Sequence, residues 1–212
     1  MKEMKTRQLG FWTGDFGNKY VERNLFSSEQ IRERGQELDK LLVSAGISKD
    51  ISILEIGANI GVNLKGLRRC GWNGVFYAVE PNRKAYEILV NDKEICLEQG
   101  VNMDGFDLPF QESSIDMVFT CGVLIHVHPD DLLRLCSEIH RVSRRYVLCV
   151  EYFSPEPVEV KYRGHDGMLF KRDFGGFYLD RWPELRLLAY GFLWKRVSCF
   201  DDVTWWLFQK LC

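Results

Sequence analysis

The residues best suited to chemistry follow a short apolar run at positions 51–56, which is rich in β-branched residues. Such a run is typical of a buried parallel strand. Glu55 lies near its end, Gly57 and Gly61 come next, and apolar positions at helical spacing follow. A strand, a glycine turn and a helix bring backbone N–H groups and a helix N-terminus up to a small ligand. The stretch therefore predicts a ligand-binding turn.

This turn departs from the dinucleotide fingerprint, which has glycines where the chain has Asn59 and Val62. A pyrophosphate needs the second glycine for its close approach to the backbone, so nicotinamide and flavin dinucleotides are disfavoured. Glu55 favours a ligand with an ammonium or sulfonium group, because it places a carboxylate just before the turn.

A second strand, at 75–80, ends in Glu80. An acid at the tip of the second strand is placed to accept hydrogen bonds from both ribose hydroxyls. Adenosine without a pyrophosphate, combined with a cationic centre, describes S-adenosylmethionine.

Three motifs occur in this order: Glu55-Ile-Gly-Ala-Asn-Ile-Gly61, Val79-Glu-Pro81 and Asp104-Gly-Phe-Asp-Leu-Pro-Phe110. They resemble the first three motifs of the class I S-adenosylmethionine-dependent methyltransferases. The resemblance implies an α/β Rossmann-like fold, with a mostly parallel seven-stranded sheet, a C-terminal antiparallel hairpin and helices on both faces. The alternative is an ordinary βαβ unit with packing glycines, which three motifs at these spacings disfavour. The expected cofactor-binding residues are Glu55, Gly57, Ala58, Asn59, Gly61, Asn63, Glu80, Pro81, Asp104, Gly105, Phe106, Cys121 and Gly122.

Asp104 has two interpretations. Its carboxylate is suited to accept a hydrogen bond from an adenine amino group, and the position that it occupies in the family favours this role. An aspartate before a glycine is also a common turn former.

Candidate catalytic residues follow the fourth and fifth predicted strands, where open α/β sheets bind ligands. His126 is the first candidate for a general base, since imidazole titrates near neutral pH. Glu151 and Tyr152 at the end of the fifth strand, and His165, are further candidates. The alternative for His126 or His128 is a packing or helix-capping role.

Two flanking segments are expected to contact the acceptor. The segment 11–24 does not match a regular strand or helix, and we expect Tyr20, Arg23 and Asn24 to lie at the site. The segment 162–175 interleaves aromatic and charged residues, which is typical of an ordered lid for an anionic substrate. Its candidates are Arg163, His165, Lys171 and Arg172. The alternatives are a hydrophobic arm and a structural insert held by its own salt bridges.

These flanks, with Tyr190–Lys195 and Asp201–Phe208, resemble the methylases associated with pseudaminic acid biosynthesis. The resemblance implies that the methyl group passes to an oxygen or nitrogen of a small, anionic, sugar-derived acceptor. A nonulosonic-acid-type sugar or its nucleotide-linked precursor fits this description. Two other classes stay open: an RNA or protein methyltransferase, and a module that binds the cofactor without transferring its methyl group.

The composition describes one ordinary globular domain. The chain has 212 residues, of which 46% are hydrophobic and 27% charged, and its formal net charge is −2. We expect no nucleic-acid partner, no membrane span and a cytoplasmic location. The seven cysteines include no C-x-x-C pair, so we expect no disulfide framework and no metal site. The monomer and the homodimer both stay open.

The expected organisation is a single methyltransferase domain over 1–212. Residues 1–45 would form an N-terminal arm and a helix that begins with a capping box at Ser27. Residues 46–154 would form the cofactor-binding core, 155–184 a substrate lid, and 185–212 the strand hairpin.

Overall fold

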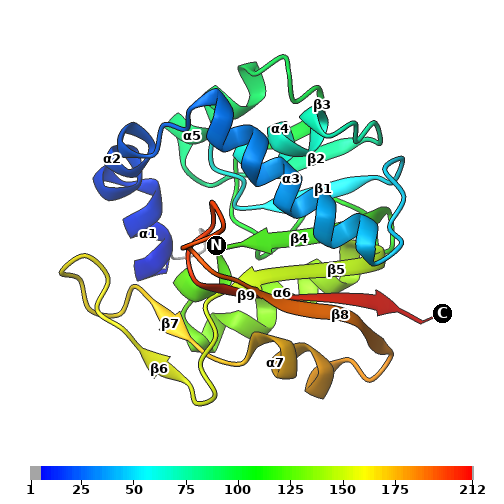
Figure 1. Ribbon diagram of the computed structural model, residues 1–212. Helices are drawn as coiled ribbons and strands as arrows, with labels where there is room; N and C mark the ends of the chain where they lie inside the picture. The colour runs from blue at the N-terminus through cyan, green and yellow to red at the C-terminus, as the bar shows by residue number, and fades with distance from the viewer. Residues whose placement is uncertain (1–5, 212) are drawn as a thin grey trace.

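The computed structural model describes residues 6–211. A seven-stranded sheet with the order β3-β2-β1-β4-β5-β9-β8 forms its centre (Figure 1). Strands β1 to β5 are parallel, and β9 is antiparallel to β5 and β8. The predicted mostly parallel sheet with a C-terminal antiparallel hairpin is confirmed. The strands are β1 Ile53–Ile56, β2 Phe76–Val79, β3 Leu97–Val101, β4 Ile115–Cys121, β5 Ser143–Glu151, β8 Leu185–Leu193 and β9 Val203–Lys210.

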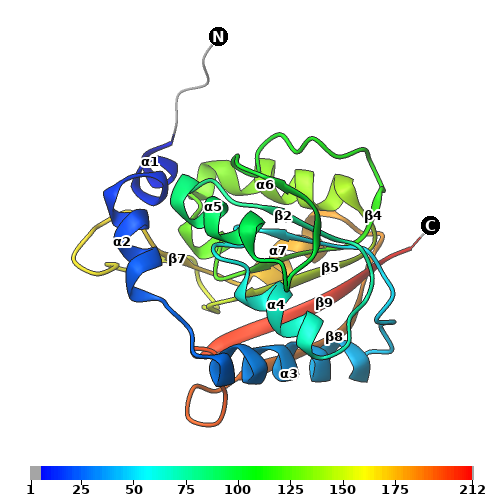
Figure 2. The same cartoon turned by 90° about the horizontal axis from the view of Figure 1, so that it is seen from above.

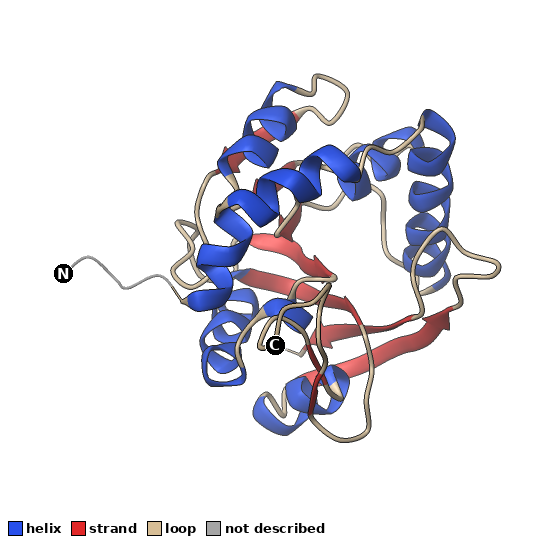
Figure 3. Cartoon of the chain, turned by 90° about the vertical axis from the view of Figure 1, so that its left-hand side faces the viewer, coloured by secondary structure: helices blue, strands red, loops and turns tan. Residues whose placement is uncertain are grey.

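Helices cover both faces of the sheet (Figure 3). Figure 2 shows α3 and α4 on one face and α6 on the other. Helices α3, α4 and α5 contribute to one apolar cluster, and α6 and α7 contribute to the second. The central strands are buried on both sides, which explains their continuous apolar sequence. The helices are α3 Ser28–Ser44, α4 Val62–Arg69, α5 Arg83–Asn91, α6 Pro129–Val142 and α7 Phe174–Arg181.

The predicted capping box at the start of α3 is confirmed. The Ser27 hydroxyl accepts from the Gln30 N–H at 3.2 Å, and the Ser27 N–H donates to Gln30 Oε1 at 2.8 Å. Each of the two backbone N–H groups thus has a side-chain oxygen as its acceptor, and this pair of hydrogen bonds fixes where the helix begins.

Helices α3 and α4 approach each other through glycine. A Cβ atom added at Gly35 would lie 2.2 Å from the carbonyl oxygen of Gly66, and one added at Gly66 would lie 2.7 Å from Gly35 Cα. Both neighbours are backbone atoms, so neither can rotate away. The contact sets how closely the helix that carries Arg34 lies over the glycine turn.

We therefore expect Gly35→Ala to lower the free energy of unfolding by about 2 kcal/mol, because the helices must separate. Urea unfolding followed by circular dichroism measures this. Gly10→Ala is the matched control, since Gly10 is exposed in a helix and its added Cβ meets nothing within 4 Å. That control should be neutral or stabilise by up to about 1 kcal/mol. Equal effects of the two substitutions would contradict the close helix crossing.

The expectation of an irregular segment at 11–24 is wrong. The chain forms α1 Arg7–Thr13 and α2 Asp15–Arg23, separated by Gly14. These helices pack through rings rather than a simple apolar stripe: Phe11 and Phe16 stack with centroids 3.9 Å apart. Gln8 Nε2 also donates to the Gly167 carbonyl at 2.8 Å. This contact to a residue far away in the sequence helps to hold α1 in place. The first five residues of the predicted arm, and Cys212, lie outside the described residues.

The segment 155–184 is not one lid. Strands β6 Val158–Glu159 and β7 Phe170–Lys171 form a separate antiparallel pair at one end of the molecule (Figure 1). Helix α7 instead buries Phe174, Phe177 and Tyr178 in the core, so the lid prediction is wrong for 174–181. None of the helices in 6–211 combines the length and apolarity needed to cross a membrane.

Candidate active site

A pocket opens beyond the carboxyl ends of β1, β2 and β4, the edge at which parallel sheets bind ligands. Helices α1 and α2 form its opposite wall through Gln8, Trp12 and Tyr20. Every predicted cofactor residue except Gly61 lines this pocket: Glu55, Gly57, Ala58, Asn59, Asn63, Glu80, Pro81, Asp104, Gly105, Phe106, Cys121 and Gly122. Three motifs that are far apart in the sequence therefore meet around one space.

The turn after β1 has a left-handed backbone at three positions. The φ angles are 69° at Gly57, 51° at Asn59 and 80° at Gly61. Asparagine tolerates this region, which explains how Asn59 replaces the usual glycine. Gly61 has a packing role, because an added Cβ would lie 2.3 Å from Ile95 Cδ1. Gly61 lies outside the lining of the pocket, its backbone shapes the turn, and its role in cofactor binding stays a prediction.

Glu80 holds the turn in place. Its Oε2 accepts from the Asn59 N–H, and its Oε1 accepts from the Asn82 N–H, each at 2.7 Å. Burial raises the pKa of Glu80 to about 7, and these two hydrogen bonds act in the opposite direction. Each oxygen keeps a second lone pair, so the carboxylate can still accept two hydroxyl groups of a ligand.

Hydrogen bonds between polar side chains connect Glu55 to helix α3. Arg34 Nε donates to Asn63 Oδ1, and Asn63 Nδ2 donates to Glu55 Oε1, both at 2.5 Å. Glu55 Oε2 is buried without a hydrogen-bond partner. Burial raises the pKa of Glu55 to about 8, so at neutral pH its carboxyl is mostly protonated. A ligand cation beside it would favour the carboxylate form.

Arg34 lines the pocket and was missed from the sequence. Its guanidinium lies 3.9 Å from the centroid of the Phe200 ring and also donates to Cys121 Sγ at 3.3 Å. It forms no ion pair with a carboxylate of residues 6–211. Position 34 falls on the apolar face of the predicted helix, between Ile31 and Leu38, and a charge on that face is the signal that could have found it.

The structure shows the turn-forming role of Asp104. Its Oδ1 accepts from the Phe106 N–H at 3.1 Å, which makes it a turn former. Asp104, Gly105 and Phe106 also line the pocket. The aspartate therefore shapes the loop at the wall of the pocket, and its hydrogen bond to an adenine amino group stays a prediction.

His126 lines the pocket between two aromatic rings. The ring centroids of Trp12 and Tyr162 lie 4.6 and 4.9 Å from it. Its Nδ1 lies 2.6 Å from the Met168 carbonyl oxygen, which can only accept, so Nδ1 carries the proton. Burial lowers the pKa of His126 to about 4. At neutral pH the ring is therefore neutral, and Nε2 is left with a free lone pair.

Glu151 and Tyr152 are not placed as catalytic groups. Glu151 is fully buried and its carboxylate accepts from the N–H groups of Val123, Leu124 and Ile125, at 3.1, 3.1 and 3.4 Å. It anchors the loop that carries His126. The Tyr152 hydroxyl donates to Asp201 at 3.0 Å, outside the lining of the pocket. The predictions of a catalytic role for these two residues are wrong, because both polar groups are engaged elsewhere.

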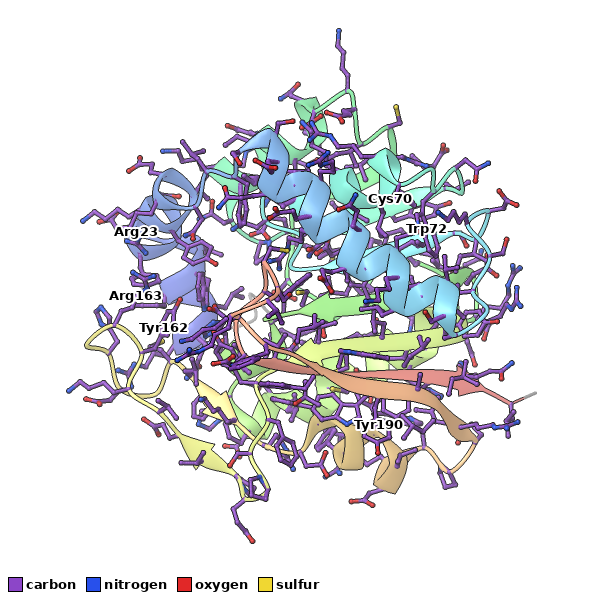
Figure 4. All side chains as sticks on the ribbon, in the orientation of Figure 1. Arg23, Cys70, Trp72, Tyr162, Arg163 and Tyr190 are labelled. Carbon is purple, nitrogen blue, oxygen red and sulfur yellow. The ribbon has the colours of Figure 1, made fainter. Side chains whose placement is uncertain are left out.

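The predicted acceptor-binding residues divide into three groups. Tyr20 and Asn24 line the pocket. Arg23, Arg163 and His165 do not; they lie in the aromatic cluster at its outer edge, where Figure 4 shows Arg23 and Arg163 near Tyr162.

Lys171 and Arg172 also lie outside this pocket and line a second cavity. Apart from Arg34, the sequence missed Trp12 and Asn82. The Asn82 amide donates to the Trp12 carbonyl at 2.9 Å and so ties α1 to the start of α5.

The comparisons with known proteins agree with this arrangement. Residues 54–150 match the family described as Methyltransferase domain. The fold is similar to magnesium protoporphyrin IX methyltransferase from Synechocystis PCC 6803 with bound SAH, at 11% identity and a TM-score of 0.70 over 95% of this chain and 96% of that chain. It is similar to 1,6-didemethyltoxoflavin-N1-methyltransferase from Burkholderia thailandensis, at 15% identity and 0.70 over 100% and 94%. It is also similar to the [4+2]-cyclase SpnF, at 14% identity and 0.60 over 83% and 80%. No curated protein sequence matches the chain.

The chain thus has the Rossmann-like fold of the S-adenosylmethionine-dependent methyltransferases. The segment that matches the methyltransferase domain runs from β1 to the end of β5. It contains the glycine turn, Glu80, Asp104 and His126, so the family match and the pocket coincide.

Proposed function

We propose that this protein is an S-adenosylmethionine-dependent methyltransferase that acts on a small polar acceptor. The observation that carries the proposal is the Glu55 carboxyl group beside the pocket, whose Oε2 is buried without a partner. A buried polar atom without a partner is costly, so a ligand that completes it is favoured. When bound, S-adenosylmethionine supplies a methyl group on a sulfonium centre.

The pocket residues fit the three parts of this cofactor. Glu80 has lone pairs free for two ribose hydroxyls. Asp104 and Phe106 are suited to the adenine. Glu55 and Arg34, joined through Asn63, lie at the other end. Once a ligand ammonium favours the carboxylate form of Glu55, the two side chains carry opposite charges, which suits the ammonium and carboxylate groups of an α-amino acid.

For the acceptor, we propose an anionic, sugar-derived molecule such as a nonulosonic-acid-type sugar or its nucleotide-linked precursor. The support is the flanking sequence, which resembles methylases associated with pseudaminic acid biosynthesis, and the wall formed by Trp12, Tyr20 and His126. Trp12 Nε1 is buried without a hydrogen-bond partner. It is therefore a donor available to an acceptor oxygen, while the rings suit the apolar face of a sugar.

His126 is the residue best placed to take a proton from an acceptor hydroxyl. The Met168 carbonyl fixes its tautomer, so Nε2 is the basic atom. The lowered pKa makes it a weak base, but it also keeps the ring unprotonated above a pH of about 4. The Glu151 carboxylate holds the backbone of the preceding loop and so positions the ring.

We expect His126→Asn to lower kcat about 100-fold, the low end for general base catalysis, because the base is weak. Affinity for S-adenosylhomocysteine should stay within about twofold of wild type. The measurement is transfer of tritiated methyl groups to N-acetylneuraminic acid and its CMP-linked form. Matched kcat values for the variant and the wild type would remove His126 from the chemical step.

Calorimetric titration with S-adenosylmethionine and S-adenosylhomocysteine tests the cofactor assignment itself. Tight binding of both is the expected result, and no binding by the folded protein would overturn the proposal. The similarity to SpnF favours one alternative, a chain that keeps the fold for another reaction. Binding without label transfer to any acidic sugar or sugar nucleotide would favour that alternative.

A further inference from the structure

A second cavity lies behind the loop that carries His126. The β6–β7 hairpin forms one side, and residues between Leu124 and Leu132 form the other. Its floor is apolar, with Leu124, Leu132 and Phe174. Lys171, Arg172, His128 and Glu159 supply its polar groups. This cavity is distinct from the pocket around the glycine turn, and the proposed cofactor contacts do not use it.

The two cationic side chains at this cavity have no direct ion-pair partner in the described part of the chain. Neither Lys171 nor Arg172 forms an ion pair with any residue in 6–211. Arg172 Nε is buried without a hydrogen-bond partner. The guanidinium groups of Arg172 and Arg181 lie over the same Phe177 ring, at 4.5 and 3.7 Å from its centroid. Burial, then the charge of Arg181, lowers the pKa of Arg172, which reflects the cost of this unpaired cation.

Three carboxylates surround this region, and one of them, Asp130, has its Oδ2 3.5 Å from His128 Nδ1. Glu159, which lines the cavity, accepts from the Gly167 N–H at 2.5 Å. Asp173 accepts from the Gly176 N–H at 2.8 Å and caps α7. An external anion is therefore the group that would satisfy Arg172, and a guanidinium matches a phosphate or carboxylate in geometry.

The cavity and the main pocket share residues. Val127 and His128 line both. His128 Nδ1 accepts from the Asp130 N–H at 3.3 Å, which leaves Nε2 to carry the proton as a donor. A ligand that reaches past Val127 can thus lie beside His126 at one end and beside Arg172 at the other.

We propose that this second cavity binds the anionic group of the acceptor, a phosphate or a carboxylate, while the part to be methylated lies beside His126. The inference rests on the proposed function, and it corrects the expectation that Lys171 and Arg172 share one lid site with Arg163. It also separates recognition of the acceptor from recognition of the cofactor. Arg34 lines the cofactor pocket, whereas Lys171 and Arg172 line the second cavity.

The proposal can be tested by NMR, by following the histidine ring resonances of the full chain saturated with S-adenosylhomocysteine while an anionic probe is added. CMP serves as the phosphate source, and N-acetylneuraminic acid as the carboxylate source. We expect one of them to shift the His128 resonance with saturation, and the His140 resonance to stay in place. His140 stacks on Trp182 and pairs with Glu184, so it reports nonspecific effects. If neither probe moves His128 at millimolar concentration, the proposal is overturned.

Variants make the result specific. Arg172→Gln should weaken the probe that binds by about tenfold or more, because a charge-assisted bidentate contact is lost. Lys171→Gln should weaken it by several-fold, and this second variant serves if Arg172→Gln folds poorly. Lys161→Gln is the matched control, since Lys161 is exposed on the same segment and lines neither cavity. Equal affinity in Arg172→Gln, Lys171→Gln and the control would exclude this site. Calorimetry with S-adenosylhomocysteine reports the cofactor pocket separately, so failure there is distinguished from failure here.

Discussion

Replacement of Glu80 by glutamine should weaken binding of S-adenosylmethionine by at least about 150-fold. Two charge-assisted hydrogen bonds to ribose hydroxyls are lost, and each contributes about 1.5–3 kcal/mol. The amide also cannot replace the carboxylate within the protein, because both Glu80 oxygens accept backbone N–H groups. In the variant, the NH₂ group of the amide would face the backbone N–H of either Asn59 or Asn82, so that two donors would meet without an acceptor. The turn after β1 would therefore lose its support as well as its ligand contact.

Calorimetry measures the affinity, and thermal unfolding without ligand shows how much stability the substitution removes. The control is Glu98→Gln, a neutral replacement of an exposed glutamate in the neighbouring strand β3. That variant should bind like wild type. A folded Glu80→Gln protein that keeps its affinity within tenfold would show that the carboxylate serves the turn alone and that the ribose lies elsewhere.

The cofactor half of this site could be predicted because its geometry is local. A buried strand, a turn with left-handed positions and a helix are specified within a dozen residues, and strands that end at the same edge bring Glu80 and Asp104 to the turn. Among the predicted cofactor residues, Gly61 alone does not line the pocket. Its type was informative, since it has a positive φ, but the sequence does not say that Ile95 fills the space beside it.

The acceptor half could not be predicted in the same way, because long-range packing decides it. Glu151 was a plausible base at a strand end, yet the loop after the neighbouring strand β4 gives it three N–H donors. Lys171 and Arg163 are eight positions apart in one charged segment, but the β6–β7 hairpin places Lys171 in a cavity and leaves Arg163 outside. The density of charged residues in 162–175 indicated that this segment recognises a ligand. Which of its residues line a cavity depends on the fold.

Arg34 shows a different limit. A charge on the apolar face of a helix is visible in the sequence, but its meaning depends on what faces it. Here the Gly35–Gly66 contact brings α3 close to α4, so that Arg34 reaches Asn63 and the pocket. With Glu55 on the other side of Asn63, the network joins a guanidinium to a carboxyl group through one amide. Its behaviour with pH follows from that pairing.

We expect binding of S-adenosylmethionine to release about one proton near pH 7, because about nine in ten Glu55 carboxyls are protonated one unit below their pKa. Burial raises the pKa of Glu55 from 4.5 to about 8. The protonated form thus favours the empty folded state, and the stability it contributes is lost as pH rises through about 8. The ligand ammonium favours the carboxylate instead. Affinity should therefore rise about tenfold per unit between about pH 6 and pH 7.5, until Glu55 and the ligand amine both titrate.

Titrations in phosphate and Tris, which differ in ionisation enthalpy, give the number of protons released. Glu55→Gln should remove about one proton from that number and weaken binding about 300-fold, since it leaves the ligand ammonium without its partner. Glu80, with a pKa of about 7, accounts for any smaller release that persists in the variant. The matched control is Glu37→Gln, an amide replacement in the same helix as Arg34 that does not line the pocket. Unchanged proton release in Glu55→Gln would mean that the ammonium lies away from Glu55. The cofactor would then have to bind with its amino acid end on Arg34 alone.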